Sequence, residues 1–386
     1  MKPVPLGNAL LELRTGPFGS LLHKADYVTG GIPLVNPMHI SGGRVCVDQE
    51  YSVSARKAAQ LSSYMLKPGH IVMGRRGEIG RCAVISESDG DLLCGTGSMI
   101  LVPNPTIIDS YYLAHLIQTP RARKFLESEA SGATMLNLNP SAAAKLPVPL
   151  PSLQEQKRIA SILDQADELR RKRRRAIDHL NQLGQAIFHE MFGDPATNPK
   201  GFEALPLGDA VEFIGGSQPA KSHFLYEDGP DRVRFVQIRD FRTDKYPTWV
   251  PKALAKRPFT EEDVMVGRYG PPVFQIFRGL SGTYNVALMK AKPKLHLTSD
   301  FVFYLLQEPK LHSFVVANSE RTAGQSGVNL DLLEKYPAYA PPAALLREFS
   351  DRIADVNSQA RAHREASMAA ERLFASLQHR AFRGEL

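Results

Sequence analysis

The chain has 386 residues, of which 43% are hydrophobic and 23% are charged, so it is globular rather than disordered. This length leaves room for two domains and an extended element. Lys and Arg number 47 against 40 Asp and Glu, and the net charge of +7 favours a polyanionic partner without requiring one. The 3 cysteines form no C-x-x-C pair, and no apolar run approaches the roughly 18 residues of a membrane span. We therefore expect a soluble cytoplasmic protein without disulfides, a zinc site or a signal peptide.

Two segments of the chain carry the same series of short motifs in the same order. The matching pairs are PLGNAL (5–10) with PLGDAV (206–211), VMGRRG (72–77) with MVGRYG (265–270), YYLAHLIQTP (111–120) with FVFYLLQEP (301–309), and SGATMLNL (131–138) with AGQSGVNL (323–330). The pairs recur at about 190 to 200 residues, which is the signature of a tandem repeat. We predict two globular domains, in which the glycine motifs lie between strands and the third motifs form short helices that end before a proline.

The stretch from 147 to 195 predicts the first long helix. Pro149 and Pro151 exclude a helix upstream, and Ser152 with Glu155 forms an S-x-x-E capping box. Alternate steps of three and four predict a narrow apolar seam that requires a partner helix. The seam contains Ile159, Ile162, Ala166, Leu169, Arg173, Ala176, Leu180, Leu183 and Ile187.

A second helix of matching length follows Pro341 and Pro342. The same stepping gives Leu346, Phe349, Ile353, Val356, Ala360, His363, Ser367, Ala370, Phe374, Leu377 and Ala381. Each seam could close with its own copy in a homodimer, but chain connectivity favours an internal antiparallel pair, because a compact domain can then join the end of one helix to the start of the other. We predict an α+β fold with two globular α/β domains (1–148 and 195–340) and a pair of long antiparallel coiled-coil helices (149–194 and 341–386).

The motifs of common enzymes are missing from the sequence. There is no phosphate-binding loop, CGTGSM (94–99) lacks the third glycine of a dinucleotide site, and His189 with Glu190 lacks the second histidine of a zinc protease. We expect a binding module with no catalytic residue, metal or cofactor of its own.

Two glycine-bracketed loops are the strongest candidates for a DNA-binding site. They place Arg75 and Arg76 in the first domain at positions equivalent to Arg268 and Tyr269 in the second. Arginine pairs bidentately with guanine in the major groove, and a loop between strands can carry it there. The alternative is a tight turn whose arginines only face solvent. We favour DNA contact, with lesser contacts from Arg56, Lys57, Lys221, Arg239 and Arg242.

A run of six basic residues, RRKRRR (170–175), lies on the first long helix. Two interpretations are open. The run is a solvated helix surface paired with acidic residues such as Asp355, Glu365 and Glu371, or it faces the phosphates of a duplex. On the second interpretation the DNA-binding residues include Arg170, Arg171, Lys172, Arg174 and Arg175.

Along its whole length the chain resembles the specificity subunit of type I restriction-modification enzymes. The resemblance is carried by PLPSLQEQKRIASILDQAD (149–167), IFHEMFGDP (187–195) and LFASLQHRAFRGEL (373–386). The second copy departs from the first, because LLREF (345–349) stands where the first has Glu155, Gln156 and Ile159.

The resemblance implies a subunit that is not catalytic by itself. Each globular domain would recognise one half of an interrupted, asymmetric site in double-stranded DNA, and the paired helices would set the distance between the halves and dock two methyltransferase subunits. Those partners would use S-adenosylmethionine to methylate adenine, and restriction and motor subunits would use ATP and Mg²⁺. The competing hypotheses are a stand-alone nucleic-acid-binding regulator and a coiled-coil scaffold that binds proteins.

Overall fold

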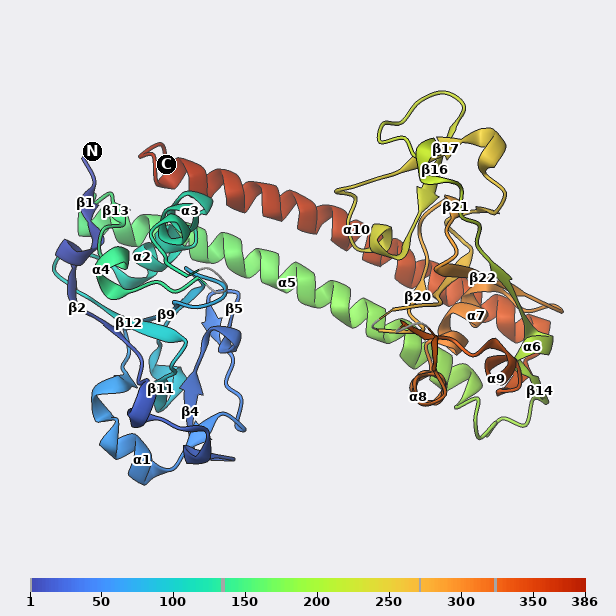
Figure 1. The fold of residues 1–386 in the computed structure, drawn as a ribbon, viewed down its shortest axis with the longest axis horizontal. Helices are drawn as coiled ribbons and strands as arrows, with labels where there is room; N and C mark the ends of the chain where they lie inside the picture. Colours follow the sequence, from blue (N-terminus) through green and yellow to red (C-terminus); the bar gives the residue numbers. More distant parts are fainter. Residues whose placement is uncertain (1, 133–135, 271, 323–324) are drawn as a thin grey trace. The chain divides into compact units, whose positions relative to one another are not determined.

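The computed structural model describes residues 2–132, 136–270, 272–322 and 325–386. The chain divides into two compact units. Unit 1 contains residues Met1–Arg173 and Ala366–Leu386, and unit 2 contains Arg174–Glu365. Two long helices, α5 (Leu153–Phe192) and α10 (Ala343–Ala381), each contribute one part to each unit (Figure 1). Within the described residues, no helix is both long and apolar enough to cross a membrane.

Unit 1 contains two main sheets with strand orders β10-β9-β12-β2 and β3-β7-β4-β11-β8. In Figure 1 the second of these sheets, with β4 and β11, lies farther from α5 than the helices α2 to α4 do. The elements are β1 (Val4–Pro5), β2 (Leu10–Thr15), β3 (Tyr27–Val28), β4 (Ile32–Val35), β5 (Ile40–Ser41), β6 (Arg44–Val45), β7 (Ser52–Val53), α1 (Ala55–Gln60), β8 (Met65–Leu66), β9 (Ile71–Gly74), β10 (Cys82–Val84), β11 (Leu92–Cys94), β12 (Ser98–Pro103), α2 (Ser110–Ile117), α3 (Pro120–Ser128), α4 (Pro140–Ala143) and β13 (Pro147–Val148).

Unit 2 also contains two main sheets, with strand orders β15-β22-β19-β20 and β17-β16-β21-β18. In Figure 1, β16 and β17 lie at the end of unit 2 away from α8 and α9. The elements are β14 (Glu203–Pro206), α6 (Leu207–Ala210), β15 (Val211–Gly215), β16 (Arg232–Val236), β17 (Trp249–Pro251), β18 (Pro258–Phe259), β19 (Val264–Gly267), β20 (Ile276–Phe277), β21 (Gly282–Tyr284), β22 (Leu288–Pro293), α7 (Ser299–Leu306), α8 (Pro309–Ala317), β23 (Glu320–Thr322), β24 (Gln325–Gly327), α9 (Leu330–Glu334) and β25 (Pro337–Ala340).

The two units share one topology, which confirms the predicted tandem repeat and the α+β class. The first sheets have matching strand orders, since β2, β12, β9 and β10 correspond to β15, β22, β19 and β20. In the second sheets, β4 pairs in parallel with β11 just as β16 pairs in parallel with β21. The YYLAHLIQTP and FVFYLLQEP motifs form α2 and α7, and each of these helices is followed by a helix whose first residue is proline. The sequence pattern therefore predicted the repeat correctly from short anchors.

The long helices pack against each other in antiparallel fashion within each unit, as predicted. In unit 1, Arg158 near the start of α5 donates a hydrogen bond to the Leu386 carbonyl (2.8 Å) beyond the end of α10. In unit 2, the ring of Phe188 near the end of α5 lies 5.9 Å from that of Phe349 near the start of α10. The internal pair is thus present in a single chain, and a homodimer is not needed to close the seams.

The seam predicted for α10 is confirmed. The apolar positions Phe349, Ile353, Val356 and Phe374 are buried, and Leu377 packs partly buried against the core of unit 1. Phe349 and Ile353 belong to the core of unit 2. Stepping by three and four from apolar residues therefore located the contact face of this helix correctly.

The seam predicted for α5 is wrong at two positions. Ile159 is buried and Ile162, Leu180 and Ile187 are half-buried, but Leu169 and Leu183 are 42% and 45% exposed. The true contact face of α5 includes the polar Gln156 and Asp167, both buried, and the small Gly184. A Cβ atom on Gly184 would lie 2.0 Å from the Tyr304 hydroxyl, so only glycine lets α7 approach this closely. The stepping rule selected apolar residues only. It therefore missed these positions and predicted exposed residues on the neighbouring face of the helix.

The start of α5 is fixed by side-chain hydrogen bonds. Ser152 Oγ accepts from the Glu155 amide (3.3 Å), as a capping residue does. The buried Gln156 accepts from the Asp109 amide (2.8 Å) and donates to the carbonyls of Ile107 (3.0 Å) and Pro151 (2.9 Å). Gln156 therefore joins the helix to the loop before α2, a role that the apolar Leu346 in the second copy cannot share.

Candidate nucleic-acid interface

Each unit carries one hairpin turn that holds the predicted DNA-binding pair. The turns lie between β9 and β10 in unit 1 and between β19 and β20 in unit 2, which confirms the predicted placement between strands. The Gly74 amide donates to the Arg81 carbonyl (2.8 Å), and the Gly267 amide donates to the Gln275 carbonyl (2.7 Å). The two turns are therefore closed by the same backbone hydrogen bond.

Two further backbone bonds hold each turn at the same residue. The Arg75 amide donates to the Gly97 carbonyl (3.0 Å), and the Arg268 amide donates to the Ala287 carbonyl (2.8 Å). In the opposite direction, the carbonyls of Arg75 and Arg268 accept from the amides of Leu138 (2.9 Å) and Val328 (3.0 Å). Each turn is thus fixed on one side by the loop that follows β11 or β21 and on the other by the segment that contains Leu138 or Val328.

These bonds correct one detail of the predicted repeat. SGATMLNL matched AGQSGVNL with Leu138 opposite Leu330, but the structure places Leu138 opposite Val328. Asn139 and Asn329 then cap α4 and α9 through their side chains. Residues 133–135 and 323–324 of the two motifs lie outside the described residues.

Arg75 is buried in unit 1, so its prediction as an exposed DNA contact is wrong. Its side chain is 5% exposed, Nε donates to the Thr96 carbonyl (3.2 Å), and Nη1 donates to Asn137 Oδ1 (2.6 Å). Burial lowers the pKa of the Arg75 guanidinium, and the neighbouring charge of Arg76 adds to this effect. Arg75 therefore ties the turn to the two segments beside it.

The remaining residues of the two turns are accessible. Arg76 is exposed next to the buried Arg75. In unit 2, the Arg268 guanidinium lies 5.1 Å from the centre of the Tyr269 ring, and both side chains are half-buried. Tyr269 forms a β-bridge with Gly327, where a Cβ atom would lie 3.1 Å from the tyrosine ring. A cation above an aromatic face is a preorganised surface for a base or a phosphate. DNA contact by Arg76, Arg268 and Tyr269 remains a prediction.

The basic run on α5 is largely paired with acidic residues. Arg170 bonds Asp167 (2.5 Å) and Glu371 (3.0 Å), and its guanidinium lies 4.4 Å from the centre of the Phe374 ring. Arg171 bonds Asp167 (2.9 Å), and Lys172 bonds Glu168 (3.0 Å). For these three residues the contacts match the interpretation of a paired helix surface. Arg174 and Arg175 are exposed on the part of α5 that belongs to unit 2, and their role toward DNA remains a prediction.

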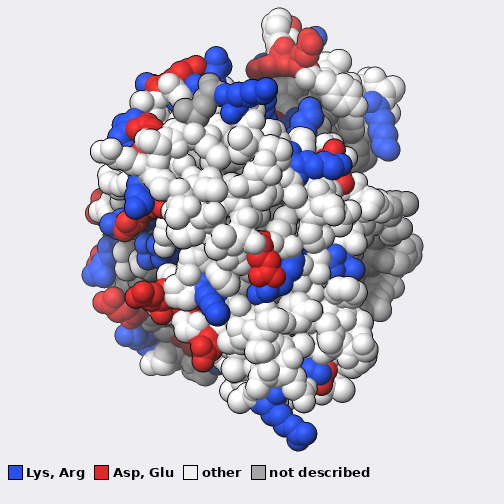
Figure 2. Space-filling view, turned by 90° about the vertical axis from the view of Figure 1, so that its left-hand side faces the viewer, with Lys and Arg blue, Asp and Glu red and all other residues white. Residues whose placement is uncertain are grey.

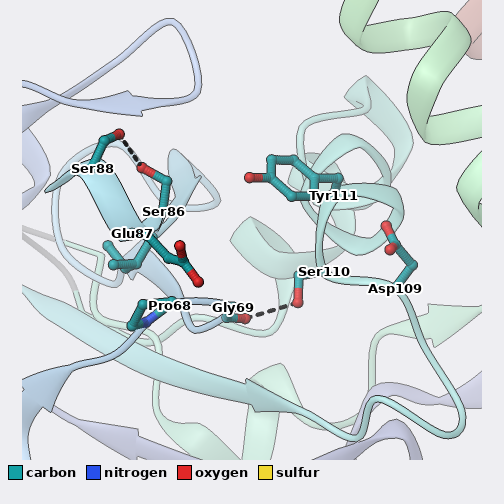
Figure 3. Close-up of a pocket in the computed structure, with 9 residues that line it drawn as sticks. Pro68, Gly69, Ser86, Glu87, Ser88, Asp109, Ser110 and Tyr111 are labelled. Carbon is teal, nitrogen blue, oxygen red and sulfur yellow. Dashed lines mark hydrogen bonds between the residues drawn. The ribbon is translucent and has the colours of Figure 1, made fainter.

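A shallow pocket in unit 1 has a volume of about 500 Å³ and lies between the turn Ser86–Ser88 and the start of α2 (Figure 3). The Ser110 hydroxyl donates to the Gly69 carbonyl (2.8 Å), and the hydroxyls of Ser86 and Ser88 lie 2.9 Å apart. The Ser86 hydroxyl also donates to Asp89 Oδ2 (2.7 Å). Across the described ranges, no three His, Cys, Asp or Glu residues converge on a potential metal site.

Figure 2 shows a face of the molecule whose centre carries few charged residues. Acidic and basic residues gather together along one edge of this face, and the basic residues form no continuous patch on it.

Several residues that build the site were missed by sequence reasoning. Asn36 Oδ1 accepts from the Gly97 amide (3.2 Å), and a Cβ atom on Gly95 would lie 2.3 Å from this oxygen. CGTGSM is therefore a turn packed against the residue that follows β4. Its two glycines were the only local signal, since the contacts of Thr96 and Asn137 with Arg75 join segments far apart in the chain.

Comparison with known proteins gives one consistent result. Residues 17–179 match the family model of the type I restriction modification DNA specificity domain. The chain is 24% identical to the type I restriction enzyme MjaIX specificity subunit of Methanocaldococcus jannaschii, over 55% of this chain and 52% of that protein. A putative MjaX specificity subunit of the same organism is 25% identical, over 73% of this chain and 71% of that protein. The EcoKI specificity subunit of Escherichia coli is 22% identical, over 94% and 83%. The match thus spans about half of the MjaIX relative.

Solved structures share the fold at low sequence identity. The S subunit of a type I restriction-modification system from M. genitalium has a TM-score of 0.61 and 15% identity, with 99% of both chains covered. A chain from a study of complex assembly and conformational transition of the type I R-M system has a TM-score of 0.50 and 18% identity, over 99% of this chain and 97% of that chain. At these identities the structures support the fold alone.

Proposed function

We propose that the chain is a specificity protein of the type I restriction-modification family and that it recognises a bipartite site in double-stranded DNA. In this proposal each unit reads one half of the site through its hairpin turn. Unit 1 would present Arg76, and unit 2 would present Arg268 and Tyr269. The two half-sites would differ in sequence because the side chains on the two turns differ.

One observation carries this proposal. The same three backbone hydrogen bonds hold both turns, although the exposed side chains differ between the units. A scaffold that repeats in its backbone while its accessible residues change is suited to reading two different targets. Exposed side chains on a loop fixed by a rigid scaffold are the usual carriers of binding function.

The proposal includes partners and excludes catalysis by the chain alone. Two methyltransferase subunits would dock on the chain and methylate an adenine in each half-site with S-adenosylmethionine. Restriction and motor subunits would join them and use ATP and Mg²⁺. The curated relatives are specificity subunits by name, and they support a role as one component of such a complex.

Co-purification from native extract, combined with mapping of methylated adenines in the source genome, tests the proposal. We expect a methyltransferase to co-purify and the modified adenines to define one interrupted, asymmetric motif that disappears when the gene is deleted. A monomer that binds one DNA sequence without any partner would instead indicate a stand-alone regulator. Protein partners without DNA binding would indicate a scaffold.

A further inference from the structure

Unit 2 has a cationic segment, residues 239–246 (RDFRTDKY), that lies between β16 and β17. Arg239, Arg242 and Lys245 are exposed, and Tyr246 is 58% exposed. The Lys245 ammonium lies 5.2 Å from the centre of the Tyr246 ring. Three cations and one aromatic ring are thus presented to solvent within eight residues.

The acidic residues of the segment cancel only part of this charge. Asp240 is buried, its Oδ2 accepts from the Gln237 amide (2.6 Å), and its Oδ1 forms an ion pair with Arg239 Nε at 3.7 Å. Asp244, whose side chain is 79% exposed, pairs with Arg234 (2.6 Å), which lies outside the segment on β16. The segment therefore exposes three cations and one carboxylate.

The cationic segment packs directly on the hairpin that carries Arg268 and Tyr269. The Phe241 ring stacks on Phe277 of β20, with centres 4.5 Å apart and planes at 11°. The Arg242 guanidinium donates a hydrogen bond to the side-chain oxygen of Gln275. The backbone carbonyl of the same residue closes the hairpin turn. The cations thus extend the surface of the predicted base-reading turn.

The segment is also held in one shape before any ligand binds. Arg239 Nη2 donates to the Tyr246 carbonyl and to Thr248 Oγ1, both at 3.3 Å. The bond from the Gln237 amide to Asp240 closes the turn at the other end. Such preorganisation lowers the entropy that binding would cost.

Unit 1 has the same turn with one exposed cation, Arg44, where unit 2 has three. Asn36 and His39 correspond to Gln237 and Asp240, since in each case the backbone amide of the earlier residue faces the side chain of the later one. Between them, Met38 is 62% exposed in unit 1. His39 is buried, and its Nδ1 lies 2.7 Å from the Leu34 carbonyl. The stretch beside the reading turn therefore exposes more cations in unit 2 than in unit 1.

We infer that the cationic segment of unit 2 is a clamp for the phosphate backbone of double-stranded DNA, next to the base-reading turn, and that unit 2 carries more of the salt-dependent affinity than the equivalent turn of unit 1. This inference rests on the proposed function. Phosphate contacts position a protein on DNA and strengthen binding to every sequence, whereas contacts with bases discriminate between sequences. The clamp would hold the duplex while Arg268 and Tyr269 test its bases.

The test uses the full chain with its methyltransferase partners and a duplex that contains the site defined by the mapped adenines. A triple variant (Arg239→Gln, Arg242→Gln and Lys245→Gln) is compared with the wild-type protein between about 50 and 200 mM salt. The slope of log affinity against log salt is negative, and each lost phosphate contact should reduce its magnitude by about 0.9. For each lost contact, the loss of affinity between about 50 and 200 mM salt should therefore be roughly 3.5-fold smaller than in the wild-type protein. The preference for the correct site over a duplex with one scrambled half should not change.

A matched control removes three other exposed cations of unit 2, with Lys200→Gln, Lys335→Gln and Arg347→Gln. It lowers the net charge equally but leaves the cationic segment intact. A double variant, Arg242→Gln with Lys245→Gln, keeps the Arg239 bonds that order the segment and should lose about two contacts.

An unchanged salt slope in the triple variant, or an equal decrease in the control, would overturn the clamp while leaving the proposed function intact. A wild-type complex without preference for the mapped site would instead refute the proposed function, and the clamp with it.

Discussion

The hairpin turns of units 1 and 2 have the same backbone hydrogen bonds but achieve their shape with different residues. The turn of unit 1 has Gly80 at φ +79°, where the turn of unit 2 has Phe274 at φ +59°. The amides of both residues donate to the carbonyl of the first glycine of their turn, at 3.3 Å and 3.0 Å. The left-handed conformation suits glycine and strains phenylalanine, so the fold of unit 2 must hold Phe274 there by packing.

The two turns also differ in the residue that follows the first glycine. Arg75 points into unit 1 and bonds Thr96 and Asn137, while Arg268 remains accessible above the Tyr269 ring. A shared sequence position therefore has a structural role in one unit and an accessible side chain in the other. Because the residue type and the backbone bonds are the same at this position, the segments packed beside the turn, such as those of Thr96 and Asn137 in unit 1, determine whether the side chain can reach a ligand.

The largest expected effect comes from removing the ring that holds the strained turn of unit 2. Phe274 is 1% exposed and belongs to the core of that unit, so Phe274→Ala should lower the free energy of unfolding of unit 2 by about 3–5 kcal/mol. Gly80→Ala in unit 1 should cost about 1–2 kcal/mol, since alanine is strained at this φ and its Cβ would lie 3.3 Å from Arg123 Cγ. Denaturant unfolding of both variants measures the difference, and equal losses would contradict this account of the two turns.

The units also differ in the residue that precedes the helix after α2 or α7, and in unit 2 this residue makes stability depend on pH. Thr119 in unit 1 and Glu308 in unit 2 both precede the proline that begins a helix. Thr119 Oγ1 accepts from the Ala122 amide (3.1 Å), whereas Glu308 accepts from the Gln185 side chain and lies 3.2 Å from His189 Nε2. Burial, aided by the negative charge of Asp194, raises the pKa of Glu308 from 4.5 to about 7.

Because the pKa of Glu308 is higher in the folded protein than in the unfolded chain, its protonation favours folding. This contribution is fully present below pH 4.5 and is lost as the pH rises through about 7. Glu308→Thr should therefore stabilise unit 2 by about 2–3 kcal/mol at alkaline pH and leave it less sensitive to pH. Thermal unfolding of both proteins across this range measures the effect, and identical pH profiles would exclude it.

The buried arginine of unit 1 gives the next effect. Arg75→Ala removes two hydrogen bonds from a charged donor and leaves Thr96 and Asn137 without this partner, which should cost about 2–3 kcal/mol of unfolding free energy. Arg268→Ala at the equivalent position should cost less than about 1 kcal/mol. Hydrogen exchange of the β9–β10 and β19–β20 turns measures each loss locally. If Arg268→Ala lost more protection in its turn than Arg75→Ala loses in its own, the structural role assigned to Arg75 would be wrong.

The two long helices show which features of the fold the sequence could predict. The contact face of α10 is apolar at Phe349, Ile353 and Val356, so simple periodicity found it. The face of α5 depends on Gln156 bonding a distant loop and on Gly184 admitting Tyr304. No local pattern marks a polar or small residue as part of a helix contact, because the partners that make it favourable come from other elements.

The candidate site was predictable to a similar extent. The glycine pairs marked both turns and their equivalence in the repeat, because a turn between strands has a local signature. The burial of Arg75 depends on Asn137 and Thr96, which no spacing places beside it. The cationic segment of unit 2 was visible only as separate charges, and its attachment to the reading turn required the packing of Phe241 on Phe277.

The most direct test of the account is selection of bound duplexes from a random library by the assembled wild-type complex and two variants, Arg76→Ala and Arg268→Ala with Tyr269→Ala. Contacts with bases are worth about 1–3 kcal/mol each, so each variant should lose sequence preference at one half of the site and retain it at the other. Arg76→Ala and the double variant should affect opposite halves. Loss at both halves in either variant, or full preference in both, would contradict the claim that the two turns read separate half-sites.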